Sequence, residues 1–317
     1  MKLAWIGNYN VDFTTEWHRT KSLEKLGHEV IRLQENKTSA DDVRKLIGQV
    51  GFLGYSHTHS PQWEIEGLLD VFNEYKNAGI PTASVHLDRY AGLQRETDVG
   101  RESSFFTEWY FSADGSPEMA QLIRKTGQKY HWLKPGVYGP ECYMAEPDRK
   151  RFPHDVIFVG SKGYHHEYNM RPRLINWLQE VYGERFAHYG GDGYGTIRGD
   201  DLNTLYASAK VVVGDSCFAG MTSNYTSDRY YETPGRGGFL LMPEIEGVHI
   251  PGVPTYRPGD MLHLRELIDY FLEIDEAREE CRIIAHEHVK KHETYTNRSK
   301  EMLEIMFPDG VPETSKG

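Results

Sequence analysis

Arg229 and Glu232 lie three residues apart, after an apolar run that stops at Gly214. Ser227 and Asp228 are candidate N-caps of a short helix that would carry both side chains on one face. In open α/β sheets, ligands bind at the carboxyl ends of the strands. A carboxylate there can accept both hydroxyls of a ribose, and a guanidinium can hold phosphate oxygens. The pattern indicates a nucleotide-type ligand, although on an isolated helix these residues would form an ordinary surface ion pair.

The loop that starts at Gly160 also suits a phosphorylated ligand, because it follows an apolar strand and contains small residues. Backbone amides of Gly160 and Ser161 can approach a diphosphate closely, and Lys162 or the later Arg171 can add positive charge. The segment is neither a Walker phosphate-binding loop nor a GxGxxG fingerprint. An ordinary turn between a strand and a helix is the alternative interpretation.

The segment 189–201 is the most glycine-dense part of the chain. So much glycine costs backbone entropy, and close approach of a planar or phosphorylated ligand would explain it. Ile197 and Arg198 lie in this segment and are candidates to line a base pocket. A flexible surface loop is the alternative.

Two loops of the first half carry groups that can take a proton from a hydroxyl. His57 and His59 follow one predicted strand, and His86 and Asp88 follow the next. The first two histidines would point the same way in an extended segment and could also bind metal. No third ligand stands at a suitable spacing in the sequence. We therefore favour a base, with His57, His86 and Asp88 as candidates, over a metal site.

Strands that alternate with amphipathic helices must position these residues, and that alternation predicts parallel sheets with right-handed crossovers. The predicted strands are 2–6, 28–33, 51–55, 81–87, 109–112, 130–133, 156–160, 185–189, 211–214 and 239–242. The predicted helices are 15–26, 40–47, 65–77, 117–126, 171–182, 201–209, a short one with Arg229, 261–273 and 276–306. Gly7 and Asn8 end the first strand, and stretches rich in proline and charge at 134–136 and 139–153 predict a linker. We expect an α/β fold with two facing Rossmann-like domains and an interdomain cleft.

Composition narrows the class of protein. A chain of 317 residues suits two domains, and a formal net charge of -11 makes a general polyanion-binding surface unfavourable, although a local basic groove is compatible with it. Cys142, Cys217 and Cys281 lie far apart, so neither a disulfide framework nor a zinc cluster is indicated. The short apolar N-terminus is not typical of a signal peptide, and no run has the length of a membrane span. We expect a soluble, cytoplasmic protein.

Several segments together resemble two-domain glycosyltransferases of the GT-B type, most closely the spore-maturation or CgeB-like group. The similar segments are the first strand with Gly7-Asn8, residues 158–161, the block 199–241 and the tail 288–304. The resemblance implies an N-terminal acceptor-side domain at 1–145 and a nucleotide-sugar-binding domain at 153–285. It also implies that a helix in 286–317 packs back on the first domain.

The resemblance also implies roles for single residues. Glu232 would hold the donor ribose, and Arg229 with the Ser161–Lys162 loop would lie near the diphosphate. Related retaining enzymes have an additional glutamate at the start of the motif that Glu232 ends, whereas this chain has Ser223–Tyr225 there. The departure leaves inversion or retention open. Asp88 stands where CgeB-like chains often carry aspartates, which makes it the first candidate for the base.

We therefore expect a metal-independent glycosyltransferase that uses a nucleotide sugar, with UDP as the nucleotide and no cofactor. Amides, Lys162 and arginines would stabilise the charge of the departing diphosphate. The acceptor stays open between a small molecule, a glycan and a hydroxymethylated pyrimidine in DNA, for which basic and aromatic residues between Arg89 and Tyr110 could form a stacking surface. A nucleotide-sugar 2-epimerase and a binding protein without turnover are the alternatives. The sequence does not indicate an oligomeric state.

Overall fold

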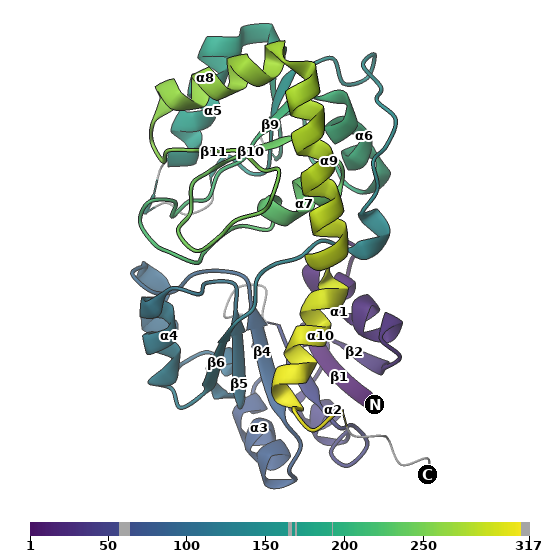
Figure 1. Ribbon diagram of the computed structural model, residues 1–317. Helices are drawn as coiled ribbons and strands as arrows, with labels where there is room; N and C mark the ends of the chain where they lie inside the picture. The colour runs from purple at the N-terminus through teal and green to yellow at the C-terminus, as the bar shows by residue number, and fades with distance from the viewer. Residues whose placement is uncertain (57–63, 164–166, 169, 192, 312–317) are drawn as a thin grey trace. The chain divides into compact units, whose positions relative to one another are not determined.

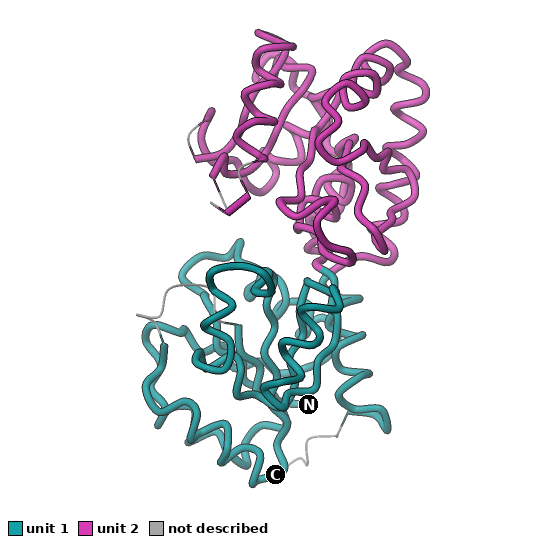
Figure 2. The backbone as a smooth tube through the Cα atoms, turned by 90° about the vertical axis from the view of Figure 1, so that its left-hand side faces the viewer, with its two compact units in different colours: residues 1–134, 295–317 teal, residues 135–294 magenta. Residues whose placement is uncertain are grey.

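The structure is a computed structural model that describes residues 1–56, 64–163, 167–168, 170–191 and 193–311. Figure 1 shows its elements, and Figure 2 shows the two compact units into which the chain divides. Unit 1 contains residues 1–134 and 295–317, and unit 2 contains residues 135–294. No described helix is long and apolar enough to cross a membrane.

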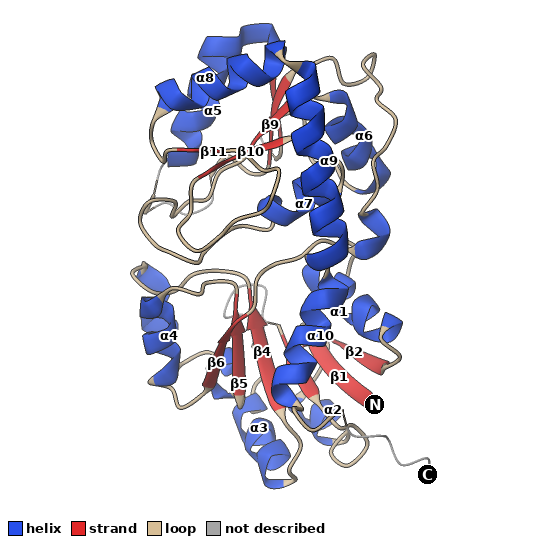
Figure 3. Ribbon diagram, in the orientation of Figure 1, coloured by secondary structure: helices blue, strands red, loops and turns tan. Residues whose placement is uncertain are grey.

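Unit 1 is built on a six-stranded parallel sheet with the order β2-β1-β3-β4-β5-β6 (Figure 3). Its strands are β1 (Lys2–Gly7), β2 (Glu29–Gln34), β3 (Leu53–Tyr55), β4 (Thr82–His86), β5 (Trp109–Ser112) and β6 (Lys129–Trp132). Its helices are α1 (Thr15–Lys25), α2 (Ala40–Arg44), α3 (Leu68–Asn77), α4 (Pro117–Arg124) and α10 (Tyr295–Met306).

Alternation along β1 divides the core of unit 1 into two faces. Leu3 and Trp5 belong to the cluster that includes Met302 of α10, and Ala4 and Ile6 belong to the cluster on the side of α2 and α3. Successive side chains of a strand point to opposite faces, so both clusters are expected from one apolar run. The last helix of the chain is thus part of the N-terminal unit, where it packs against α1.

Unit 2 is also an α/β unit, built on a five-stranded parallel sheet in the order β11-β10-β9-β7-β8. Its strands are β7 (Val156–Val159), β8 (Phe186–Tyr189), β9 (Val211–Val213), β10 (Leu240–Pro243) and β11 (Thr255–Tyr256). Its helices are α5 (Met170–Tyr182), α6 (Gly199–Ser208), α7 (Arg229–Gly235), α8 (Met261–Glu273) and α9 (Asp275–His292). Strand β11 has only two residues, so no hydrophobic alternation in the sequence indicates it.

The two units have boundaries that differ from the expected domains. The chain passes from unit 1 to unit 2 after residue 134, within the first stretch predicted as a linker. Residues 139–153, the second stretch, belong to unit 2, and Cys142 and Phe152 are buried in its core. The predicted helix 276–306 is two helices. The break comes where Val137 donates its amide proton to the Glu293 carbonyl and forms a strand-like bridge with Thr294.

Counted from the amino end of each unit, the five strands of unit 2 have the same order as the first five strands of unit 1. The order reverses between β1 and β3 in unit 1, and between β7 and β9 in unit 2. The predicted pair of Rossmann-like α/β domains is therefore present. In such sheets, ligands bind outside the carboxyl ends of the strands that flank the reversal.

Candidate functional site

Arg229 joins the carboxyl ends of β7 and β9. The two strands pair at Val156 with Val211 and at Ile157 with Val212, and the pairing stops there. Beyond that point, Arg229 Nε donates to the Val159 carbonyl at 2.8 Å and Nη1 donates to the Asp215 carbonyl at 3.2 Å. The guanidinium thus takes the place of ladder hydrogen bonds at the point where the strand order reverses. These contacts fix the start of α7 at the edge of the sheet.

Gly160 makes this position of Arg229 possible. Its φ is +138°, and an added Cβ would lie 2.2 Å from Arg229 Nη2. Only glycine combines that backbone conformation with so close a contact. Nearby, an added Cβ on Gly190 would lie 2.1 Å from the Gly160 carbonyl oxygen, and His188 Nε2 lies 2.6 Å from the same oxygen. Close packing of the backbone therefore explains Gly160 and Gly190 without any ligand.

Arg171, in the first turn of α5, ties the loop after β7 to the end of β9. Its Nε donates to Asp215 Oδ2 at 3.0 Å, Nη1 donates to the Ser161 carbonyl at 3.3 Å, and Nη2 donates to Cys217 Sγ at 3.3 Å. Each of its guanidinium nitrogens therefore contacts the protein. Lys162 Nζ donates to Asn176 Oδ1 on the exposed side of α5, at 2.8 Å.

The edge of the sheet carries more positive than negative charge. Burial lowers the pKa of the Arg229 guanidinium, and the positive charge of Arg171 lowers it further. The two cations are thus held close enough to repel each other. Asp215 is the buried carboxylate beside them, and it neutralises one charge of the two. An anion at this edge would relieve the remaining repulsion.

Glu232 lies one helical turn after Arg229 and is half-buried. In the part of the chain that the structure describes, its carboxylate makes no hydrogen bond, and no ion pair joins it to Arg229. Burial alone would lower the pKa of Arg236, but the charges of Glu232 and Glu141 raise it. Arg236 is itself held by Asn203 Oδ1 at 2.8 Å and by the Glu141 carboxylate. The surface ion pair considered for Arg229 and Glu232 is not formed.

Ser216 is a residue that the sequence analysis did not single out. It follows Asp215 at the end of β9 and is 3% exposed, yet its Oγ has no hydrogen-bond partner among the described residues. Its only sequence signal is its place directly after a buried strand, which many serines share.

Ile197 and Arg198 lie immediately before α6. Ile197 is half-buried and packs against the core of unit 2, whereas Arg198 is exposed and its Nη1 donates to the Ile197 carbonyl at 3.1 Å. The structure thus gives Ile197 a packing role, and it places Arg198 at the surface.

In unit 1, His86 is the last residue of β4 and Asp88 follows the strand. His86 Nδ1 accepts the backbone amide proton of Asp88 at 3.0 Å, so the ring proton is on Nε2, which lies 3.2 Å from Tyr90 Oη. Tyr90 in turn donates to Glu102 Oε2 at 3.0 Å. Both ring nitrogens of His86 are thus engaged. The Asp88 side chain is 30% exposed and pairs with Arg95 at 3.3 Å, and His57 lies outside the described residues.

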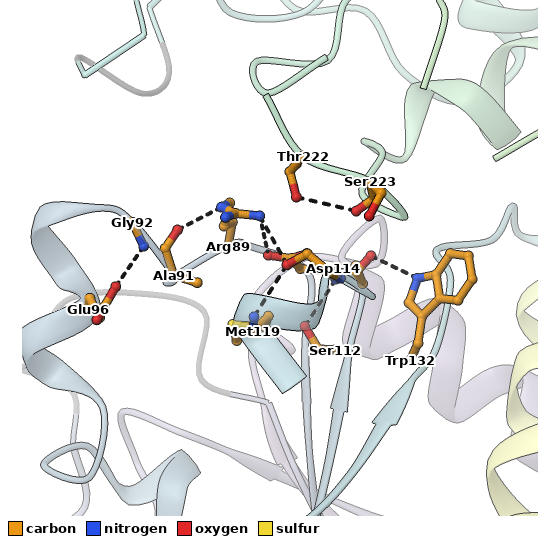
Figure 4. Close-up of polar contacts among 12 residues, drawn as sticks. Arg89, Ala91, Gly92, Glu96, Ser112, Asp114, Met119, Trp132, Thr222 and Ser223 are labelled. Atoms are coloured by element: carbon orange, nitrogen blue, oxygen red, sulfur yellow. Dashed lines mark hydrogen bonds and ion pairs between the residues drawn. The ribbon is translucent and has the colours of Figure 1, made fainter. Parts of the chain in front are cut away.

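Figure 4 shows the buried ion pair at the end of β5. Arg89 Nη1 donates to Asp114 Oδ2 and to Ser116 Oγ, both at 3.1 Å, and Nε donates to the Ala91 carbonyl at 2.7 Å. Burial raises the pKa of Asp114, and the charge of Arg89 opposes that shift.

Part of the surface considered for stacking bases is buried. Arg89 is buried, and Tyr90, Phe105 and Tyr110 belong to an apolar cluster with α4. The rings of Phe105 and Tyr110 are stacked with centroids 5.4 Å apart, and Tyr90 meets Phe105 edge-on at 5.2 Å. The prediction of a basic, stacking surface is therefore wrong for these residues, because the rings fill the core.

Gly7 and Asn8 shape the end of β1. An added Cβ on Gly7 would lie 2.6 Å from Glu16 Cγ, so glycine is required for α1 to approach the strand. Asn8 Oδ1 accepts from the Asn10 amide at 3.2 Å, and the Asn8 carbonyl accepts from Thr14 Oγ1 at 2.7 Å. Both residues thus have packing and loop-forming contacts.

A cavity of about 720 Å³ in unit 1 is lined by residues that follow β2 and by residues that precede α3. Its lining residues are Glu35, Asn36, Thr38, Ser39, Ala40, Asp41, Glu64, Ile65 and Glu66. Four of them are carboxylates and none is a lysine or an arginine. Within the described ranges, no three His, Cys, Asp or Glu side chains gather in a way that could hold a metal ion.

Comparisons with known proteins agree with this description of the fold. Residues 171–304, which include Arg171, Arg229 and Glu232, match the family model described as glycosyl transferase-like. No curated protein matches the sequence.

Three solved structures are similar over nearly the whole chain. HepE from Anabaena, with UDP and glucose, has a TM-score of 0.64 at 11% identity, covering 97% of this chain and 100% of its own. An alpha-glucosyltransferase with UDP-glucose and DNA containing an abasic site has a TM-score of 0.71 at 10% identity, covering 96% of this chain and 99% of its own. A Listeria monocytogenes protein assigned as a UDP-N-acetylglucosamine 2-epimerase has a TM-score of 0.53 at 10% identity, covering 99% of this chain and 98% of its own. The chain therefore has the two-domain GT-B fold, and its second half matches the glycosyl transferase-like family.

Proposed function

We propose that this protein is a glycosyltransferase that moves a sugar from a UDP-linked donor to a hydroxyl group. The observation that carries the proposal is the edge of β7 and β9, where Arg229 and Arg171 face one buried carboxylate, Asp215. One turn further, Glu232 has a carboxylate that the described residues leave without a hydrogen bond. Similar structures with bound UDP and UDP-glucose support a donor of this class.

The chemistry follows from the charges. Breaking the bond between sugar and phosphate leaves negative charge on the departing UDP, and preorganised cations stabilise that charge most where water is excluded. Arg229 Nη2 is the guanidinium nitrogen that is not bonded to a backbone carbonyl. The Glu232 carboxylate accepts hydrogen bonds from both ribose hydroxyls. Such bonds are strong, because the acceptor is charged. The arginines supply positive charge at this edge, and we propose that the reaction needs no metal ion.

On the acceptor side, we propose Asp88 as the base, because it is partly exposed at the carboxyl end of β4. His86 positions it through the hydrogen bond to the Asp88 amide. The cavity with four carboxylates and the net charge of -11 both repel phosphodiesters. We therefore propose a small neutral acceptor or a glycan, and we place DNA second, although one similar structure contains DNA.

The test of the donor site is UDP binding by calorimetry to the parent and to Glu232→Ala. Loss of hydrogen bonds to a charged group weakens binding by about 1.5–3 kcal/mol, or roughly 10- to 150-fold. Glu180→Ala removes an exposed glutamate from α5 and is the matched control, with unchanged affinity. Equal UDP affinity in Glu232→Ala and the parent would show that the ribose assignment is wrong.

Product analysis with radiolabelled UDP-sugars then distinguishes the reactions. Transfer of label to an acceptor supports the proposal, conversion of the sugar within the donor indicates an epimerase, and unchanged donor indicates a binding protein. The same assay in EDTA tests the role of metal. Activity that disappears in EDTA and returns with manganese or magnesium would contradict metal independence.

A further inference from the structure

Ser216 has the one buried hydroxyl at the edge of β7 and β9 that the described residues leave without a partner. It is 3% exposed, its Oγ makes no hydrogen bond, and its own carbonyl accepts from the Ala219 amide at 3.0 Å. Buried hydroxyl groups nearly always have a hydrogen-bond partner, because leaving one unpaired costs free energy. An unpaired hydroxyl in a native structure therefore needs an explanation.

The neighbours of Ser216 are engaged elsewhere. The Asp215 carboxylate on one side accepts from Arg171, and the Asp215 carbonyl accepts from Arg229 Nη1. The Cys217 thiol on the other side lies 3.3 Å from Arg171 Nη2. Arginine thus occupies the acceptors of the residues on both sides of the serine, and the serine hydroxyl between them is left without a partner. A group with several acceptor oxygens and negative charge fits these surroundings.

We propose that the Ser216 hydroxyl donates a hydrogen bond to the diphosphate of the donor. The inference rests on the proposed function, and it adds a neutral donor to the charge of Arg229. A phosphate oxygen is an acceptor only, so the serine must donate its proton to it. The hydroxyl is thus left unpaired in the ligand-free protein and becomes satisfied when the nucleotide binds.

This arrangement predicts opposite effects on stability and on binding. Ser216→Ala removes an unpaired hydroxyl, so the unfolding midpoint of the ligand-free protein should stay the same or rise. Its UDP affinity should fall about tenfold or more, because a hydrogen bond to a charged group is lost. Its affinity for uridine, which has no phosphate, should equal that of the parent. A serine with a purely structural role would lower the unfolding midpoint and change both affinities together.

Ser299→Ala is the matched control. Ser299 is also fully buried, lies in α10 of unit 1, and has an Oγ without a partner among the described residues. Its replacement should leave UDP affinity unchanged. Calorimetric titration of the parent and both variants with UDP and with uridine, together with urea unfolding of the ligand-free proteins, makes the complete experiment.

The outcomes separate this inference from the proposed function. A parent that binds UDP, with a Ser216→Ala variant that binds it equally well, overturns the role of Ser216 and leaves the glycosyltransferase proposal standing. Equal losses for UDP and uridine also overturn it, because the serine would then shape the site without contacting phosphate. A parent that binds no UDP overturns both.

Discussion

The five strands of unit 2 follow the same order as the first five strands of unit 1, but the two units carry charges of opposite sign near their strand ends. In unit 2, Arg229 and Arg171 lie at the ends of β7 and β9 with one buried carboxylate. In unit 1, a cavity with four carboxylates is lined by residues that follow β2 and by residues that precede α3. The two units thus share a topology but differ in the sign of the charges near their strand ends, and charges of opposite sign suit ligands of opposite charge.

Each unit also has one buried Arg–Asp pair at its sheet edge, and the surroundings of the two pairs differ. Arg171 and Asp215 lie beside a second arginine, Arg229, whereas Arg89 and Asp114 are held with Ser116. In unit 1 the two charges of the pair balance each other. In unit 2 the charge of Arg229 is added to a pair that is already balanced. We propose that Arg171 and Asp215 contribute to ligand binding, whereas the contacts of Arg89 and Asp114 suit a role in stability.

The largest expected effect comes from breaking the pairs. Arg171→Met and Arg89→Met each leave a buried aspartate without its partner, which costs about 3–5 kcal/mol of unfolding free energy. Urea unfolding at pH 7 measures the loss. UDP binding, measured by calorimetry on the folded variants, should weaken in Arg171→Met and stay unchanged in Arg89→Met. A loss of UDP affinity in Arg89→Met, with none in Arg171→Met, would reverse the comparison.

The double variant Arg171→Met/Asp215→Leu is the control for that prediction. It removes both charges, so no buried carboxylate is left unpaired and most of the lost stability should return. UDP affinity should stay low, because the positive charge is still missing. A double variant as unstable as Arg171→Met would show that packing, not charge, determines the loss.

A change in unit 1 should affect turnover without affecting donor binding. Asp88→Asn removes the proposed base, and turnover should fall by roughly 100-fold or more while UDP affinity stays the same. Initial rates with saturating UDP-sugar measure turnover, and calorimetry measures UDP affinity. Asp70→Asn, on the exposed side of α3, is the matched control. Near-normal turnover in a folded Asp88→Asn protein would exclude Asp88 as the base.

The smallest expected effect is a pH dependence in unit 1. Burial raises the pKa of Asp114, so the folded protein binds this proton more tightly than the unfolded chain does. The contribution of Asp114 to stability is therefore complete below its unfolded pKa of about 4 and is lost as the pH rises through the higher folded pKa. The unfolding free energy of the parent, relative to Asp114→Asn, should decrease between pH 4 and pH 7. A difference that grows with pH would contradict the assigned direction.

Much of the fold could be read from local patterns. The predicted strand 109–112 and the helix 261–273 have the bounds of β5 and α8. Periodicity and turn residues act over a few positions, so a single sequence reports them well. The break between α9 and α10 was missed, since it depends on a backbone contact with Val137, more than 150 residues earlier in the chain. The short strand β11 was missed for lack of any pattern.

The candidate site was located from the sequence, but the partners of its residues were not. The sequence identified Arg229, Arg171 and Glu232 as polar residues near strand ends. It did not show that Arg229 bonds to a carbonyl 70 residues away, or that Arg171 pairs with a carboxylate 44 residues away. The only signal for Ser216 was its place after a buried strand, because an unpaired hydroxyl is a property of its surroundings.

The sequence by itself determined the alternation of strands and helices, and with it the edge of the sheet where ligands bind, since hydrophobic periodicity and glycine turns are local properties of the chain. Tertiary structure alone decided which charges meet at that edge. Arg229 inserts between two strands because Gly160 leaves room for it, and the Arg89 and Asp114 side chains pair inside the core. Such pairings depend on burial and on long-range distances, and neither quantity is encoded in the spacing of residues along the chain.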